Sequence, residues 1–143
     1  MKRIILCVIF ALMLTSYVFS EQAPADGPFK AYFDNGTLQT MGYYRNGKGN
    51  GVFIEYYSNG RIEMVREFKD DVLNGIFLAF HENGMLSDEG YFKMGKSIGV
   101  HKRWSEEGAL IVLTENDEQG NEIKQILYDL DGNILSKTSE TAK

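Results

Sequence analysis

The chain has 143 residues, 43% of them hydrophobic and 13% aromatic, with 15 Lys and Arg against 20 Asp and Glu. This composition excludes an intrinsically disordered chain, because enough apolar surface is present to form a packed domain. The acidic balance also argues against nucleic acids and other polyanions as partners.

The first predicted element is an export signal at residues 1–20. Lys2 and Arg3 precede an apolar run from Ile4 to Leu14, and small residues follow near Ser20. This order is typical of a secretory signal peptide. We therefore expect a protein that is exported to the periplasm or the extracellular space.

Cleavage after Ser20 is the first choice, and Ala23-Pro24-Ala25 offers an alternative site. A retained membrane anchor is the other interpretation, but residues 4–19 fall short of the roughly 20 apolar residues that a spanning helix needs. Cleavage removes Cys7, the only cysteine, so the exported protein would have neither a disulfide nor a zinc-thiolate site. It also removes two of the 15 basic residues and none of the 20 acidic ones, which leaves a net charge of −7.

After a linker at residues 21–28, the sequence repeats with a step of 24 residues. Short turn segments such as DNG, SNG and ENG end in the glycines Gly36, Gly60, Gly84, Gly108 and Gly132. Four positions before each turn glycine, in the −4 column, the residues are Tyr32, Tyr56, Phe80, Trp104 and Tyr128. Two positions after it, in the +2 column, they are Leu38, Ile62, Leu86, Leu110 and Ile134.

These two apolar columns predict the type of turn. A three-residue loop closed by a left-handed glycine pairs the −4 column with the +2 column and places both on one face. A two-residue turn would instead pair +2 with the −3 column, which includes Ser105 and Asp129. Each unit is therefore predicted to be a β-hairpin, for example residues 52–57 and 61–68, followed by a loop at residues 69–74.

The predicted fold is all-β, a repeat array of antiparallel β-hairpins of period 24 that forms one elongated twisted sheet over residues 29–135. The −4, −6 and +2 columns are expected to be consumed by packing as a shared apolar seam. Turn glycines at positions 120 and 132 predict hairpins at a step of 12 in the last unit. Residues 136–143 are polar and are predicted to form a frayed tail.

The segments IEYYSNGRIEMVREFKDDVLNG and FLAFHENGMLSDEGYFKMGKSIG resemble the variant MORN repeats of bacterial proteins similar to the YwqK-type antitoxin family. The resemblance covers about residues 29–135. It implies a hairpin array that serves as a protein-binding surface and, in some members, neutralises a toxin. The export signal would move such a role to the periplasm. The acidic charge argues against strong binding to anionic membranes.

We predict no catalytic, cofactor-binding or metal-binding residues. His81 and His101 are the only histidines and fall in columns otherwise rich in aromatic residues, so we interpret them as structural or surface residues. The segments DLDGN and NDEQGN resemble parts of calcium loops, but neither has acidic residues at both ends of a twelve-residue loop. Asp117 and Asp129 are therefore interpreted as turn residues.

The aromatic residues of the −3 and −7 columns are expected to remain free for a partner. The candidate partner-binding residues are Phe53, Tyr57, Phe77 and His81. The predicted function is that of an exported, non-catalytic protein-binding module. The alternatives are an antitoxin or immunity protein with one cognate toxin, and an envelope structural element that assembles as a homo-oligomer. A second copy or the terminal strands could also cover the face that carries these four residues.

Overall fold

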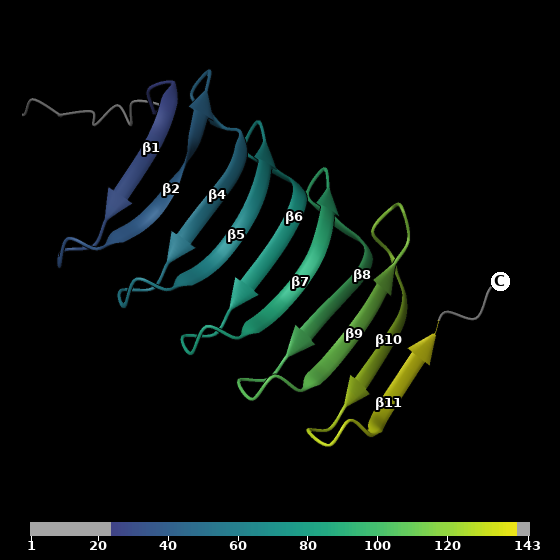
Figure 1. Ribbon diagram of the computed structural model, residues 1–143. Helices are drawn as coiled ribbons and strands as arrows, with labels where there is room; N and C mark the ends of the chain where they lie inside the picture. The colour runs from purple at the N-terminus through teal and green to yellow at the C-terminus, as the bar shows by residue number, and fades with distance from the viewer. Residues whose placement is uncertain (1–23, 140–143) are drawn as a thin grey trace, which may run out of the picture.

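The computed structural model describes residues 24–139, which form one open antiparallel sheet of 11 strands (Figure 1). The predicted signal peptide and residues 140–143 of the predicted tail lie outside the described residues. Within residues 24–139 no helix has the length and apolar character needed to cross a membrane. The strands are β1 (Gly27–Tyr32), β2 (Leu38–Arg45), β3 (Lys48–Gly49), β4 (Gly51–Tyr56), β5 (Ile62–Lys69), β6 (Val72–Phe80), β7 (Leu86–Lys93), β8 (Lys96–Trp104), β9 (Leu110–Asn116), β10 (Glu122–Tyr128) and β11 (Ile134–Ser139).

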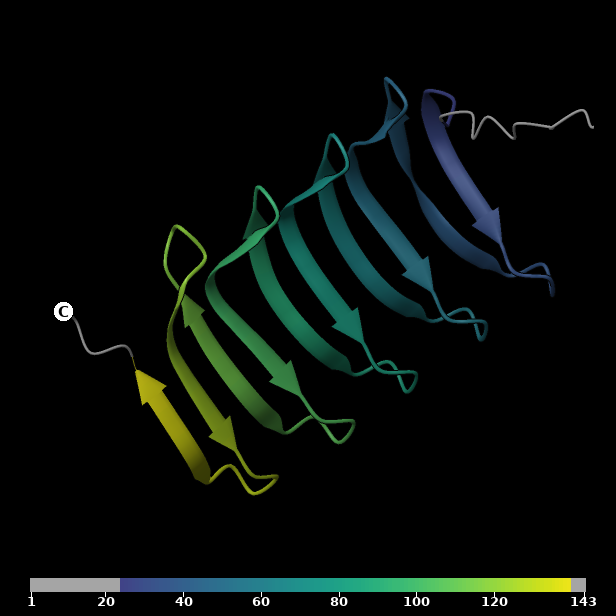
Figure 2. The same cartoon turned by 180° about the vertical axis from the view of Figure 1, so that it is seen from behind.

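The strands follow one another across the sheet in chain order, except that the short β3 pairs only with β2. Figures 1 and 2 show the hairpins side by side, with β1 at one end of the array and β11 at the other. The predicted all-β array of antiparallel hairpins is confirmed. The last strand continues to Ser139, beyond the point at which the polar tail was expected to begin.

Three-residue loops close the hairpins at one end of the array, as predicted. In the second unit the Gly60 amide donates to the Tyr57 carbonyl, and the Tyr57 amide donates to the Arg61 carbonyl, both at 2.9 Å. Tyr56 pairs with Ile62 after a bulge. Gly60 has a φ of 83°, and the other four turn glycines lie between 83° and 91°. The turn position therefore requires glycine, because a side chain is strained at such φ values.

At the other end of the array the predicted loop at residues 69–74 is wrong. Lys69 pairs with Val72, and only Asp70 and Asp71 lie between them, with φ values of 51° and 67°. Two consecutive positive φ values are the mark of a type I′ turn, whose twist suits a tight hairpin. Strand β6 therefore begins at Val72 and passes through Gly75 instead of starting there.

The sheet is a single layer, so neither of its faces is covered by another element of the described chain. Among residues 24–139, the buried hydrophobic side chains are Phe53 and Ile126, each 8% exposed. The expectation that packing consumes the −4 and +2 columns is wrong for Tyr32, Ile62 and Ile134, which are 58%, 38% and 59% exposed, whereas the other seven residues of the two columns are half-buried. These columns do share one face, as predicted, but that face is open.

Candidate interaction surfaces

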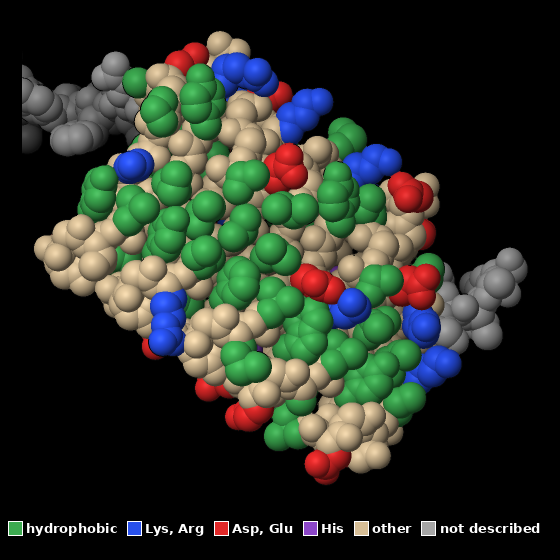
Figure 3. Space-filling model, viewed as in Figure 1, with side chains coloured by type: hydrophobic (Ala, Val, Ile, Leu, Met, Phe, Trp, Pro, Cys, Tyr) green, Lys and Arg blue, Asp and Glu red, His purple; other side chains and the backbone are tan. Residues whose placement is uncertain are grey.

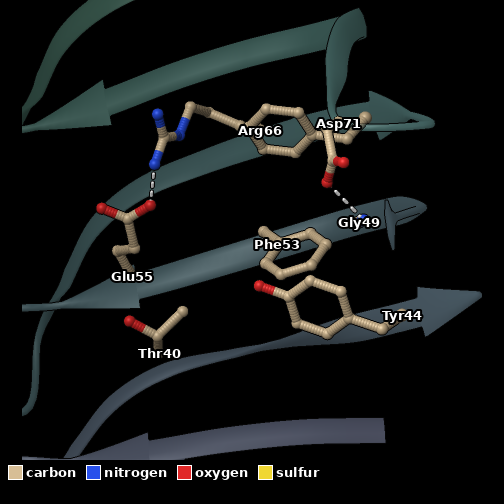
Figure 4. A pocket seen from close by; sticks show the side chains of 8 residues that line it. Thr40, Tyr44, Gly49, Phe53, Glu55, Arg66 and Asp71 are labelled. Carbon is tan, nitrogen blue, oxygen red and sulfur yellow. Dashed lines mark hydrogen bonds and ion pairs between the residues drawn. The ribbon is translucent and has the colours of Figure 1, made fainter. Parts of the chain in front are cut away.

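One face of the sheet, here called the ladder face, carries a row of packed aromatic rings. The rings of Phe29, Tyr44, Phe53 and Phe68 follow one another across β1, β2, β4 and β5 with centroids 5.4 Å apart and nearly perpendicular planes. Edge-to-face contacts of this kind are favourable because the positive edge of one ring meets the negative face of the next. Figure 4 shows Tyr44 and Phe53 on this face.

Glycines on neighbouring strands make room for two of the ladder rings. A Cβ atom on Gly42 would overlap the Phe53 ring, and one on Gly90 would lie 2.7 Å from His101 Nδ1. Gly42 and Gly90 are two repeats apart, and the equivalent position between them is Arg66. The ring-over-glycine arrangement therefore occurs in alternate units, and Arg66 occupies the glycine position in the middle unit.

Arg66 on β5 and Glu55 on β4 form an ion pair on the ladder face, at the edge of a hollow of about 230 Å³ (Figure 4). The Arg66 guanidinium also lies 5.3 Å from the centroid of the Phe68 ring, a cation–π contact. Asp71 closes one side of this hollow, because its Oδ1 atom accepts a 2.6 Å hydrogen bond from the Gly49 amide. The Glu55 and Asp71 carboxylates are thus engaged within the sheet, whereas Arg66 Nε is buried without a hydrogen-bond partner among the described residues.

A second polar cluster on the ladder face contains serine, histidine and aspartate. Ser97 Oγ lies 3.4 Å from His101 Nδ1, and His101 Nε2 lies 3.6 Å from Asp88 Oδ1. Arg103 Nε donates to the same Asp88 oxygen at 2.9 Å, and Asn116 donates to Ser97 Oγ at 3.2 Å. Because both Asp88 and Ser97 have closer partners than His101, the geometry is that of a polar packing cluster.

Tyr57 and His81 join consecutive hairpins at the three-residue loops. The Tyr57 hydroxyl donates to the Phe80 carbonyl at 2.7 Å, and His81 Nε2 lies 3.0 Å from the Trp104 carbonyl, to which it donates. Each contact connects a −3 residue to the −4 residue of the next unit. Burial raises the pKa of the Tyr57 phenol above its usual value, and three nearby glutamates add to the effect.

The structure separates the four candidate partner-binding residues into two groups. Phe53 and Phe77 belong to the ladder face, where both pair across the strands with Arg66, whereas Tyr57 and His81 lie at the loops. The expectation that packing leaves these side chains free is wrong for Phe53, which is only 8% exposed. The interpretation of His81 and His101 as structural residues agrees with their contacts. Partner binding by the four residues stays a prediction.

The opposite face, here called the apolar face, carries the −4, −6 and +2 columns. Pairing across the strands defines its middle row as Lys30, Met41, Ile54, Val65, Leu78, Glu89, Lys102, Leu113, Ile126 and Lys137. A row of −4 and +2 residues lies beside it near the three-residue loops. A row toward the two-residue turns contains Tyr43, Val52, Glu67, Ile76, Tyr91, Val100, Glu115 and Lys124. Figure 3 shows hydrophobic side chains gathered across this face.

The row toward the two-residue turns is the most regularly exposed part of the apolar face. Its exposed fractions are 47% at Tyr43, 45% at Val52, 40% at Ile76, 49% at Tyr91 and 46% at Val100. The last three of these residues line a hollow of about 380 Å³ over β6, β7 and β8. Glu67 interrupts the row between Val52 and Ile76. A set of exposed apolar residues that extends over several strands is typical of an interaction site.

The glutamates of the apolar face are engaged within the sheet. Glu89 pairs with Lys102 at 2.9 Å, and Glu115 lies 3.9 Å from Lys124. The Glu67 carboxylate lies over Gly75 and accepts a hydrogen bond of 3.4 Å from the Ile76 amide. A partner that covered this face would therefore meet charges that already have local partners.

Comparison with known families is informative for the first half of the array. Residues 25–46, 49–70 and 73–94 each match the family model described as MORN repeat variant. These three segments are MORN repeat variants. In the structure each MORN repeat supplies one hairpin, formed by β1 and β2, by β4 and β5, and by β6 and β7. The turn period continues beyond the matched MORN repeats to Gly108 and Gly132.

Comparison with individual proteins adds little to the MORN match. No curated protein matches the chain. A mutant of S. aureus TarM in complex with fondaparinux, alpha-GlcNAc-glycerol and UDP is 7% identical with a TM-score of 0.42, and the match covers 80% of this chain and 20% of that one. A GtfA/B complex bound to UDP and GlcNAc is 13% identical with a TM-score of 0.27, covering 87% and 29%. Both TM-scores are too low to carry an argument.

Proposed function

We propose that this protein is an exported, non-catalytic protein-binding module that contacts its partner through the apolar face. The MORN repeats support a binding role, because a repeat array presents an extended and rigid surface. The observation that carries the proposal is the exposed apolar row from Tyr43 to Val100. Such a surface gains free energy when a protein covers it, since apolar area is removed from water.

The polar clusters support a non-catalytic role. The Ser97, His101 and Asp88 cluster comes nearest to a hydrolytic arrangement, but Arg103 holds Asp88 and Asn116 holds Ser97. The Ser97–His101 distance of 3.4 Å is also slightly longer than the roughly 2.6–3.2 Å typical of a serine nucleophile and its base. These side chains instead stabilise the contact between β7, β8 and β9.

Export rests on the sequence of residues 1–20. The expected mature protein begins at Glu21, and the mass of the protein recovered from the cell envelope or medium measures this directly. A start at Asp26 would identify the alternative cleavage site after Ala25. An intact N-terminus would instead support a retained anchor and contradict cleavage.

The binding role is tested by affinity capture with matched surface variants. The bait variant combines Val52→Lys, Ile76→Lys and Val100→Lys, which places three charges in the exposed apolar row. Met94→Lys is the control, because Met94 is 79% exposed in the turn between β7 and β8 and is not one of the strand residues that form this row. We expect the wild-type bait and the control bait to capture the same partner protein and the triple variant not to capture it. Circular dichroism should show that all three baits are folded. Equal capture by the triple variant would contradict the proposal.

A variant on the ladder face tests the alternative, that the partner binds there and not on the apolar face. Loss of capture by Phe77→Ala at an unshifted melting temperature, together with normal capture by the triple variant, would locate the contact at the predicted residues instead. The antitoxin role that the YwqK-type resemblance implies stays a prediction. Its test is binding to a toxin encoded by a neighbouring gene.

A further inference from the structure

We propose that the partner of the apolar face is a second copy of this chain, so that two sheets pack with their apolar faces together. This inference rests on the proposed function and names its partner. It follows from the area, the charge and the shape of the apolar face.

The area of the apolar face matches the requirement of a stable dimer. Its middle row crosses ten strands, which at about 4.8 Å each span roughly 45 Å, and its three rows occupy about 20 Å of strand length. The face therefore measures roughly 900 Å², close to the ~800 Å² per partner that a stable interface buries. Two sheets pack well at a separation of about 10 Å when their inner faces are apolar.

The charge of the apolar face suits contact between two acidic molecules. The whole chain has a net charge of −5, so two copies repel one another over most of their surface. The middle row and the row toward the two-residue turns contain Lys30, Lys102, Lys124 and Lys137 against Glu67, Glu89 and Glu115. On this face two copies can approach with little repulsion, and the glutamates already have partners within each sheet.

The apolar face also carries both a hollow and protruding side chains that could fill the same hollow on a second copy. An interface with two-fold symmetry uses the same surface on both copies, so each hollow must be filled from the same face of the partner. The hollow over β6, β7 and β8 is apolar at Ile76 and Val100. Tyr32 and Tyr43, which are 58% and 47% exposed, are large side chains of the same face that a second copy can present to it.

Assembly through the sheet edges is less favourable than assembly through the apolar face. β1 and β11 are the edge strands. Pro28 on β1 has no backbone amide to donate, and Lys30 and Lys137 place a charge on each edge strand. Proline and lysine on edge strands oppose pairing with another chain.

The test measures the mass of the exported protein by sedimentation equilibrium over a range of concentrations. We expect a reversible monomer–dimer equilibrium for the wild type and for Met94→Lys. The triple variant Val52→Lys, Ile76→Lys and Val100→Lys should raise the dimer dissociation constant by at least about a hundredfold, because each lysine enters a desolvated contact. Val52→Lys alone is the milder variant if the triple variant melts early. All variants have the same N-terminus, so any self-association caused by residues 1–20 would be the same in each of them.

The outcomes distinguish this inference from the proposed function. A wild type that remains monomeric while the triple variant loses a captured protein overturns the second copy as partner and leaves the binding module intact. A dimer that persists in the triple variant, or open-ended polymers, would place self-association at the edges and overturn the inference. A dimer that forms in the wild type and in Met94→Lys but not in the triple variant supports the inference.

Discussion

Two glycines of the ladder face make room for side chains and do not form turns. Gly42 and Gly90 lie within strands and are not in the left-handed region, yet a side chain at either would meet the ring of Phe53 or His101. The rings can lie flat over the backbone only because these positions have no Cβ atom. The packing of the ladder face therefore depends on glycine at some positions as much as on aromatic residues.

The Gly42→Ala variant should lower the free energy of unfolding by about 1–3 kcal/mol, because the added methyl overlaps the Phe53 ring and forces it from its place. Chemical denaturation measures this value. The control is a double-mutant cycle with Phe53→Leu, in which the cost of Gly42→Ala should fall by at least about 0.5 kcal/mol. An additive cycle would mean that the ring and the methyl do not meet.

The Tyr57→Phe variant should lose about 0.5–1.5 kcal/mol, because it removes the hydroxyl that donates to the Phe80 carbonyl. The pKa of Tyr57 is raised by burial, so its contribution is present below the ordinary tyrosine pKa of about 10 and is lost as the pH rises through the raised value. Ultraviolet titration should show one phenol fewer at high pH in the variant. A Tyr57 phenol that ionises with the exposed tyrosines would refute this assignment.

At the residue level the sequence could predict the face of each column but not its exposure. The −4 and +2 columns lie together on one face, as the glycine register predicted. Which face packs internally depends on ring-over-glycine contacts such as that of Phe53 with Gly42, which join residues eleven positions apart. Column hydrophobicity does not contain this information, because both faces carry aromatic residues.

The hairpins of the array have a different turn at each end. The end with three-residue loops depends on glycine at the third loop position. The other end uses two residues with positive φ values in its first three turns and a three-residue loop closed by Gly120 in its last. Asn46-Gly47 is the preferred sequence for such a two-residue turn, and Asp70-Asp71 and Met94-Gly95 occupy the equivalent positions. Both kinds of turn keep successive strands antiparallel in one sheet.

The Gly84→Val variant should destabilise the protein by about 1–3 kcal/mol, because Gly84 has a φ of 91° that a β-branched residue tolerates poorly. Thermal melting compares this variant with Met85→Val, which changes the next residue without a positive φ. Similar melting temperatures for the two variants would show that the loop does not require glycine.

The last hairpin should weaken in acid. Hydrogen bonds from Asn133 and from backbone amides lower the pKa of the Asp129 carboxyl, so its contribution is complete above the unfolded pKa and is lost as the pH falls below about 4. The protection factors of the β11 amides against hydrogen exchange, which correct for the intrinsic pH dependence of exchange, should fall over this range. Asp129→Asn keeps an acceptor but does not titrate, and it should remove the pH dependence; an unaltered dependence would implicate another group.

The sequence could predict the hairpins because each depends on residues close together in the chain. The two-residue turns were missed at Asp70-Asp71, which has no glycine. At this turn the Asp71 side chain accepts a hydrogen bond from the Gly49 amide, and the Asp71 backbone amide donates one to the Gly49 carbonyl. These contacts join neighbouring units, 22 residues apart, so single-turn preferences do not reveal them.

The described chain as a whole is a single-layer sheet with a row of packed aromatic rings on one face and an apolar face that buries Ile126 but leaves the apolar residues from Tyr43 to Val100 exposed. The repeat period was enough to predict an all-β array, because each hairpin meets only its neighbours. The exposure of Tyr32, Ile62 and Ile134 in the −4 and +2 columns could not be predicted in the same way, since it depends on the absence of a second layer over residues 24–139. The open face is therefore the main feature that the structure adds to the sequence.

Oxidative footprinting of Tyr43 and Tyr44 tests the central claim, that the apolar face is the contact surface covered by a second copy. These consecutive residues lie on opposite faces, Tyr43 47% exposed on the apolar face and Tyr44 packed between Phe29 and Phe53. As the wild-type concentration rises through the dimer range, oxidation of Tyr43 should slow severalfold while that of Tyr44 stays constant. Unchanged oxidation of Tyr43, or protection of Tyr44 alone, would contradict the claim.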